Sequence, residues 1–97
     1  MAIFKLTLQK TYYRQGFFNV TVDFDHYVRK AEGEISIVLG NTGQKLKGRI
    51  DRQANMNGTA RIHGGADLRD WFERYFTVMD TVDVDLSSQD VIRLSKP

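Results

Sequence analysis

Short segments in which every second residue is apolar follow one another along this chain, and they restrict its fold more than any other feature. From Phe4 to Leu8 and again from Val82 to Leu86, apolar residues alternate with Lys, Thr or Asp. This period of two is typical of a strand with one buried face. Further strand-like segments are residues 17–22, 34–39, 45–52, 59–62 and 91–94. Seven short strands at this spacing predict a closed or nearly closed barrel.

Two helices are expected between these strands. The clearer one runs from Ala66 to Phe76, where apolar and aromatic residues recur at helical spacing. A shorter one is expected at residues 24–29, with Asp23 as its N-cap. The run Gly40-Asn41-Thr42-Gly43 predicts a hairpin turn between the two middle strands. No repeat or linker interrupts this pattern, so residues 1–97 are expected to form one domain.

The composition excludes several classes of protein. Among the 97 residues, 41% are apolar and 27% are charged, which suits a soluble globular domain rather than a disordered segment. The chain has no cysteine, which excludes disulfides, thiol catalysis and cysteine-bound zinc or iron–sulfur clusters, and fits a reducing compartment. It has no apolar run near the roughly 18 residues that span a bilayer, and its first residues do not resemble a signal peptide. We therefore expect a cytoplasmic protein that does not contact membranes.

The net charge of +2 is unevenly distributed along the chain. Residues 1–61 hold ten Lys or Arg and five Asp or Glu, whereas residues 62–97 hold four basic and seven acidic residues. The two parts carry net charges of +5 and −3. This segregation predicts one face that attracts an anionic partner.

Groups suited to catalysis are sparse. His26 and His63 lack the spacing of a metal-binding pair, and the motifs of Mg²⁺-dependent nucleases, serine hydrolases and phosphate-binding loops are missing. Three carboxylate pairs have one residue between their members, so on strands each pair would share a solvated face: Asp23 and Asp25, Glu32 and Glu34, Asp83 and Asp85. We expect no catalysis, no metal, no cofactor and no small-molecule substrate. A minimal nuclease that uses His26 or His63 is the alternative.

Two polar segments, residues 10–19 and 49–61, are rich in side chains that recognise nucleic acids. Arg, Gln and Asn can form two hydrogen bonds with one base edge, whereas Lys, Thr and Tyr suit phosphates. The base-reading candidates are Arg14, Gln15, Asn19, Arg52, Gln53, Asn55, Asn57 and Arg61. The candidates for contacts with the DNA backbone are Lys10, Thr11, Tyr13, Lys45, Lys47, Arg49 and Thr59.

Other interpretations of the same residues stay open. Asn57-Gly58 suits a turn with positive φ as well as it suits a base contact. The stripe of Lys45, Lys47 and Arg49 is either a phosphate-binding surface or only a charged strand face. Single-stranded nucleic acid is a further alternative ligand, and it would need exposed aromatic residues for stacking. The candidates are Tyr12, Tyr13, Phe17 and Phe18, of which the last two are strand neighbours that cannot both face the core.

The order of these features resembles the B-three pseudobarrel of plant transcription factors and of restriction-endonuclease effector domains. A strand leads into a basic segment, a short helix and a hairpin; a second basic segment, a Trp-containing helix and two strands follow. The resemblance covers about residues 3–95. Its most specific stretches, residues 13–20 and 52–62, look like those of the bacterial restriction-enzyme branch. Met79-Asp80 stands where plant members have a Gly-Asp turn, which makes the geometry of this turn uncertain.

The resemblance implies a mainly β (α+β) fold, a seven-stranded open pseudobarrel with two short helices. It implies that residues 10–19, the N-arm, and residues 49–63, the C-arm, grip double-stranded DNA in the major groove. In this family the domain has no catalysis and no metal. We then expect a monomeric N-terminal effector domain of a bacterial Type II (IIE-like) restriction endonuclease. A covalently linked, separate nuclease domain would use Mg²⁺, and a short site containing CC/GG is the first DNA to probe.

Overall fold

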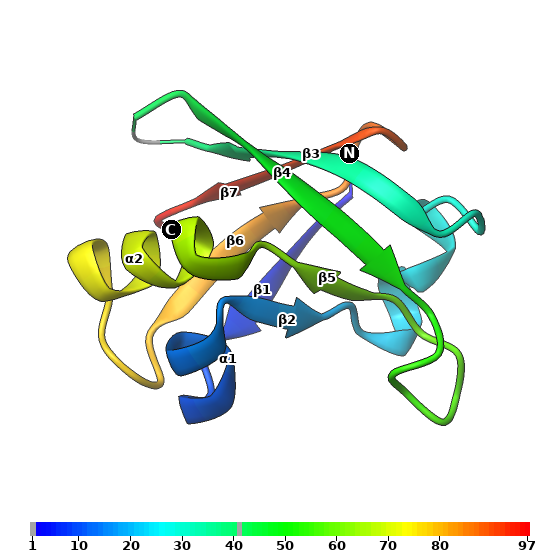
Figure 1. The fold of residues 1–97 in the computed structure, drawn as a ribbon, viewed down its shortest axis with the longest axis horizontal. Coiled ribbons are helices and arrows are strands. Elements are labelled where there is room, and N and C mark those ends of the chain that lie inside the picture. The colour runs from blue at the N-terminus through cyan, green and yellow to red at the C-terminus, as the bar shows by residue number, and fades with distance from the viewer. Residues whose placement is uncertain (1, 41) are drawn as a thin grey trace.

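A computed structural model describes residues 2–40 and 42–97, so Asn41 of the expected hairpin turn lies outside the described residues. Seven strands form one curled sheet in the order β1-β6-β7-β3-β4-β5-β2 (Figure 1). Neighbouring strands are antiparallel except β3 and β7, which are parallel. The strands are β1 (Ile3–Thr7), β2 (Phe17–Asn19), β3 (Gly33–Leu39), β4 (Gln44–Asp51), β5 (Arg61–His63), β6 (Thr81–Asp85) and β7 (Val91–Ser95).

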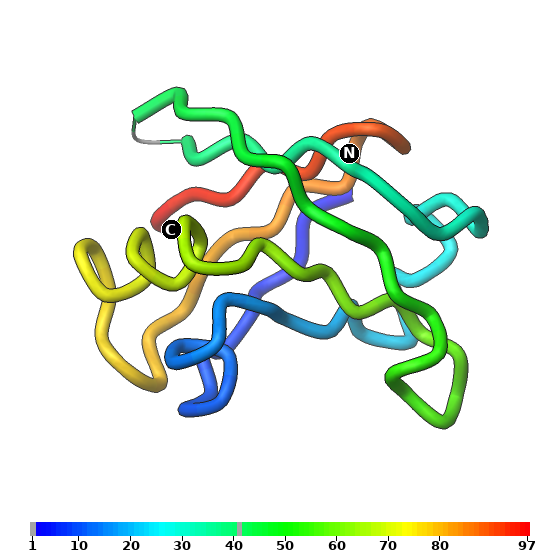
Figure 2. The backbone as a smooth tube through the Cα atoms, viewed as in Figure 1, coloured from blue at the N-terminus to red at the C-terminus, as the bar shows by residue number. Residues whose placement is uncertain are grey.

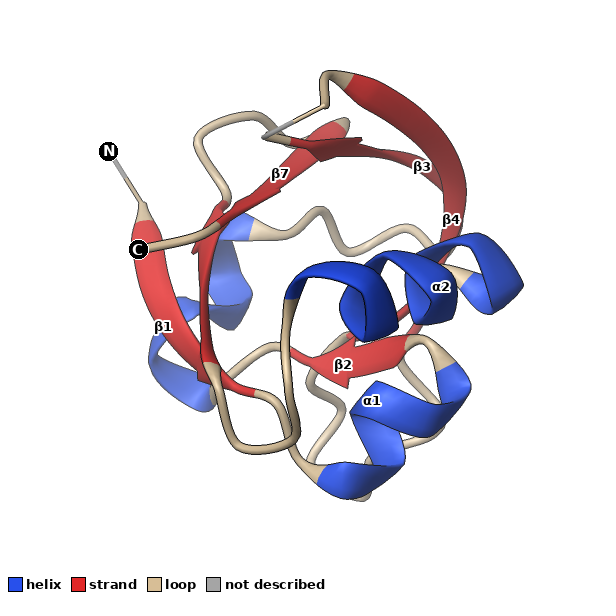
Figure 3. Ribbon diagram, turned by 90° about the vertical axis from the view of Figure 1, so that its left-hand side faces the viewer, coloured by secondary structure: helices blue, strands red, loops and turns tan. Residues whose placement is uncertain are grey.

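The sheet curls around one apolar core without closing. β1 and β2 stand at the two ends of the strand order, so the barrel stays open between them (Figure 3). Alternation decides which side chains fill the core: in β1, Phe4 and Leu6 are buried while their neighbours are exposed. The largest fully buried side chains include Phe18 and Phe72. The expected seven-stranded open pseudobarrel is confirmed, and all seven expected strands are present.

Two helices lie near the positions that the sequence predicts. α2 (Gly65–Tyr75) buries Leu68, Trp71 and Phe72 and covers one end of the curled sheet (Figure 1). The second helix, η1 (Val22–Tyr27), is a 3₁₀-helix that begins before Asp23. Its N-cap is Thr21, with no side-chain cap hydrogen bond, so the prediction of Asp23 as the cap was wrong.

A third helix, α1 (Lys10–Gln15), was not predicted, and the described residues therefore hold three short helices rather than two. It ends at Gly16, whose φ of 73° is left-handed. The Gly16 carbonyl accepts hydrogen bonds from the N–H groups of Gly64 and Gly65, at 2.8 and 3.1 Å. A Cβ at Gly16 would lie 2.1 Å from the Gly65 oxygen, so this close approach requires glycine. The end of the N-arm is thereby fixed to the start of α2.

The sequence did not decide the geometry of the turn between α2 and β6. In the structure this turn contains one residue in the left-handed backbone conformation. Met79 has φ 74°, the one positive φ of a non-glycine residue among those described. The Asp80 carboxylate accepts a hydrogen bond from the Thr77 N–H at 2.8 Å, and the Met79 N–H donates to the Leu8 carbonyl. These bonds hold the turn in a conformation that glycine adopts more easily than methionine.

None of the helices in the described ranges 2–40 and 42–97 is long and apolar enough to cross a membrane.

Candidate nucleic-acid interface

Strand pairing brings the N-arm and the C-arm together. β2 belongs to the N-arm and pairs with β5 of the C-arm, with Asn19 opposite Arg61. β5 also pairs with β4, where Arg61 lies opposite Asp51. The outward side chains of these three strands form two rows: Asn19, Arg61 and Asp51, then Phe17, His63 and Arg49. Figure 2 shows the α1 segment (blue) and the 52–60 loop (green) projecting from the same side of the sheet.

The Arg61 guanidinium is held in a fixed orientation at the centre of this surface. Its Nε donates to Asn19 Oδ1 at 3.0 Å, and its Nη2 donates to Asn55 Oδ1 at 3.4 Å. Its Cζ lies 4.5 Å from the centroid of the Phe17 ring, which is buried beneath it. Asn55 Nδ2 donates to Asn19 Oδ1 at 3.0 Å, which links the two arms directly. These contacts with described residues use two of the five guanidinium N–H groups, so three can donate to a ligand.

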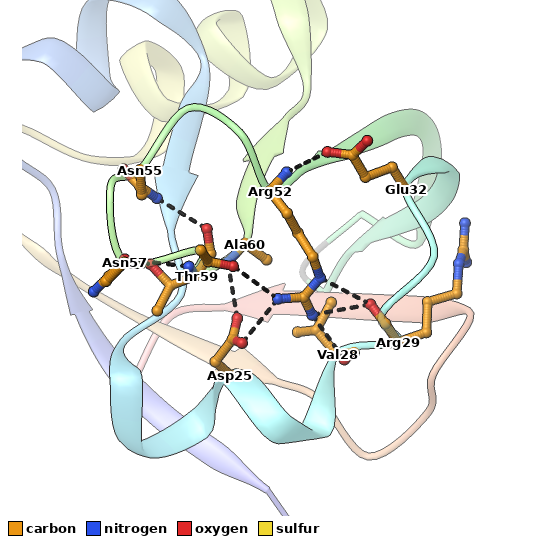
Figure 4. A network of polar contacts seen from close by, with 10 residues as sticks. Asp25, Val28, Arg29, Glu32, Arg52, Asn55, Asn57, Thr59 and Ala60 are labelled. Carbon is orange, nitrogen blue, oxygen red and sulfur yellow. Dashed lines mark hydrogen bonds and ion pairs between the residues drawn. The ribbon is translucent and has the colours of Figure 1, made fainter.

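Arg52 has a different environment, shown in Figure 4. Its side chain is only 16% exposed, and its Nη1 lies 2.8 Å from the Asp25 carboxylate. The guanidinium also donates to the backbone carbonyls of Val28, Arg29 and Gly58, at 2.9–3.3 Å. All five N–H groups therefore have partners inside the protein. Base reading by Arg52 would require these bonds to break, which favours a structural role for this residue.

Asp25 was not expected to matter for this surface. The sequence interpretation expected Asp23 and Asp25 to be merely solvated, whereas Asp25 lies on η1 with a side chain only 22% exposed. Asp25 Oδ2 accepts from Arg52, while its Oδ1 accepts from the Ala60 N–H at 2.8 Å. One carboxylate thus fastens both ends of the 52–60 loop. Pairing between residues 27 positions apart leaves no local pattern in the sequence.

The 52–60 loop is also braced from within. The Asn57 Oδ1 accepts from the Thr59 hydroxyl at 2.8 Å, and the Gly58 N–H donates to the Asn55 carbonyl at 3.0 Å. Gly58 has φ 77°, as the turn interpretation of Asn57-Gly58 requires. Thr59 is buried at 8% exposure, which does not favour the phosphate contact that we expected of it. Gln53 and Asn57 are exposed.

Most of the remaining candidates lie at the surface. Two N-arm tyrosines face inward: the Tyr13 hydroxyl donates to the Phe76 carbonyl at 3.2 Å, and the Tyr12 hydroxyl accepts from Asn19 Nδ2 at 3.1 Å. Arg49 lies 3.8 Å from the Asp51 carboxylate. The exposed candidates on α1 and β4 are Lys10, Thr11, Arg14, Gln15, Lys45, Lys47 and Arg49.

Asp51 is an anion within this basic surface. Hydrogen bonds from the Gln53 N–H, and further contacts with His63, Ala54 and Arg49, hold the pKa of Asp51 below its usual value despite partial burial. The His63 Nε2 lies 3.4 Å from Asp51 Oδ2. Asp51 therefore stays charged at neutral pH and forms an ion pair with the Arg49 guanidinium.

The described residues contain no group of three or more His, Cys, Asp or Glu that could hold a metal ion. His26 lies on η1 beside Tyr27, whereas His63 lies on β5 beside Asp51.

No protein-family model matches the chain. A comparison with curated proteins gives no match either. The function must therefore be argued from the surface itself.

Proposed function

We propose that the protein is a sequence-specific module for double-stranded DNA, which it contacts through the N-arm and the C-arm in the major groove. One observation carries this proposal: Arg61 is oriented by Asn19 and Asn55 while three of its N–H groups can serve a ligand. Arginine fixed in this way suits the two acceptors that guanine presents in the major groove. The fixed geometry lowers the entropy lost on binding, because a free arginine would first have to be ordered.

The cations around this centre support the same ligand. Lys10 is exposed on α1, and Lys45, Lys47 and Arg49 are exposed on the outer face of β4. α1 leads into β2, and β4 pairs with β5, so these cations lie on elements next to the strand of Arg61, where we expect them to contact phosphates. Contacts with phosphates provide affinity that does not depend on sequence, whereas the contacts with bases provide specificity.

The structure refines the roles that the sequence suggested. Arg52 and Thr59 hold the C-arm loop, and Tyr13 anchors α1, so the proposal leaves them out of the DNA contacts. Asn19 and Asn55 act first by orienting Arg61. In addition to Arg61, the base-reading candidates that remain in the proposal are the exposed residues Arg14, Gln15, Gln53 and Asn57.

The resemblance described above extends this proposal. It suggests a monomeric effector domain of a bacterial Type II restriction endonuclease, with cleavage by a separate nuclease domain. In that arrangement the present domain binds a copy of the recognition site and catalyses nothing. Incubation of the 97-residue chain with plasmid and Mg²⁺ tests this part. Cleavage that is lost on replacement of His26 or His63 would contradict it.

Selection of bound sequences from randomised duplexes tests DNA recognition itself. With the selected duplex, Arg61→Ala should weaken binding about 5- to 150-fold, the range expected for one two-pronged base contact, and should change binding to an unrelated duplex much less. Arg61→Lys should also lose discrimination, because a lysine keeps the charge but not the planar fork. Arg93→Ala is the matched control, because Arg93 is exposed on β7, which β3 separates from the strands of both arms. Equal losses on both duplexes would reduce Arg61 to a phosphate contact.

Salt titrations and competition with single strands complete the test. Lys47→Ala should lower the slope of log affinity against log salt by about one, since one phosphate contact is removed. Single strands should compete poorly, because Phe18 is in the core and Phe17 lies beneath Arg61. A preference for single strands would contradict the proposal.

A further inference from the structure

The 52–60 loop presents an apolar side chain where solvent is fully accessible. Met56 has a relative exposure of 107%, the highest among the large apolar residues described, and Val22 follows at 67%. Both line the same hollow of about 580 Å³, which lies between the loop and the end of the N-arm. Asn19 and Asn55, which orient Arg61, line it as well. The hollow therefore combines amide groups with an apolar rim.

The loop cannot easily bury Met56 by moving. Arg52 and Asp25 fasten its two ends, and the Gly58 N–H donates to the Asn55 carbonyl across its tip at 3.0 Å. A methionine in a mobile loop could fold back on the sheet, but here the backbone holds it outward. A hollow that joins apolar side chains to a few hydrogen-bonding groups, as this one does, is typical of a binding site.

We propose that Met56 contacts the C5-methyl group of a pyrimidine, thymine or 5-methylcytosine, next to the base pair that Arg61 reads. This inference rests on the proposed function. The C5-methyl is the apolar group that a base pair presents in the major groove, where it stands beside hydrogen-bonding atoms of the same base edge. The hollow offers the matching arrangement, with Met56 and Val22 beside the amides of Asn19 and Asn55. A methionine suits this contact because its unbranched, polarisable side chain adapts to irregular apolar surfaces.

Single-methyl changes in the DNA test the inference without disturbing hydrogen bonds. In the selected duplex, each thymine is replaced in turn by uracil and each cytosine in turn by 5-methylcytosine, and dissociation constants are measured for each duplex. If thymine is read, one uracil replacement should weaken binding about fourfold, the value of one buried methyl group. If 5-methylcytosine is read, one methylation should strengthen binding by about the same factor.

The protein variants decide whether Met56 is responsible. Met56→Ala should abolish the methyl effect, and Met56→Leu should keep most of it. Because Met56 is fully exposed, neither change should alter the free energy of unfolding. Met79→Ala is the matched control: Met79 is 64% exposed but lies on the α2–β6 turn, so the methyl effect should persist.

The outcomes separate this inference from the proposed function. Selection without any preferred duplex would overturn both. A preferred duplex with no methyl effect at any position would overturn the role of Met56 alone, and so would a methyl effect of equal size in Met56→Ala.

Discussion

Replacing Arg52 by alanine should destabilise the protein rather than simply remove a base contact. The guanidinium forms five hydrogen bonds, one of them to the Asp25 carboxylate at 2.8 Å. Net values of about 1 kcal/mol per hydrogen bond would give about 5 kcal/mol as an upper limit. Breaking a buried ion pair costs about 3–5 kcal/mol, and here the two side chains are still 16% and 22% exposed, which favours the lower end.

We therefore expect Arg52→Ala to lower the free energy of unfolding by about 3 kcal/mol, out of the total of about 5–15 kcal/mol usual for a domain. Arg52→Lys should recover little of this, because an ammonium group cannot reach all the carbonyls that the fork reaches. Urea denaturation followed by circular dichroism measures the change. Gln53→Ala is the control, since the neighbouring Gln53 side chain is exposed.

A base-reading Arg52 would give the opposite result. In that case Arg52→Ala would leave the free energy of unfolding within about 0.5 kcal/mol of the wild type and would reduce binding to the selected duplex alone. That combination of results would refute the structural role that we assign to the hydrogen bonds of Arg52. It would also restore the role that the composition of the C-arm suggested for this residue.

Two further predictions concern stability. Met79→Gly should raise the free energy of unfolding by about 0.5–1 kcal/mol, because relief of the left-handed strain at φ 74° is partly offset by the greater freedom of glycine in the unfolded chain; a lower urea midpoint would contradict this. Asp51 has a lowered pKa, so its stabilising effect is present above the usual pKa of an aspartate and is lost as the pH falls through the folded-state value. In Asp51→Asn, the free energy of unfolding measured by urea titration should therefore fall less steeply below about pH 4 than in the wild type. The same pH dependence in both proteins would exclude this role of Asp51.

The strands could be predicted because their signal is local. Alternation within a few residues decides which side chains enter the core, and this holds for β1 and β6 whatever their partners are. The helix α1 could not be predicted in the same way. It has six residues, too few for an apolar stripe, and it is fixed by Gly16 and its contacts with α2 rather than by its own propensity.

The sequence predicted which two polar segments form the candidate interface. It did not predict the role of each residue within them. Arg52 and Arg61 look alike in the sequence, since both stand in polar segments with Asn and Gly nearby. Only the fold places the Asp25 carboxylate beside one guanidinium and two amide oxygens beside the other. The same donors that suit a base edge also suit backbone carbonyls, so the partner decides the role.

The two hydrogen bonds on the Gly16 carbonyl have a consequence for the length of any DNA site. They join the N-arm to the segment that follows β5, so the arms keep a constant separation. Each inserted base pair moves the next one by about 3.4 Å along the duplex and rotates it as well. If both arms contact DNA as we propose, a site lengthened by one pair would leave one arm without its bases. Under the proposed function, these backbone hydrogen bonds would thus help to set the number of base pairs that a single copy of the protein spans.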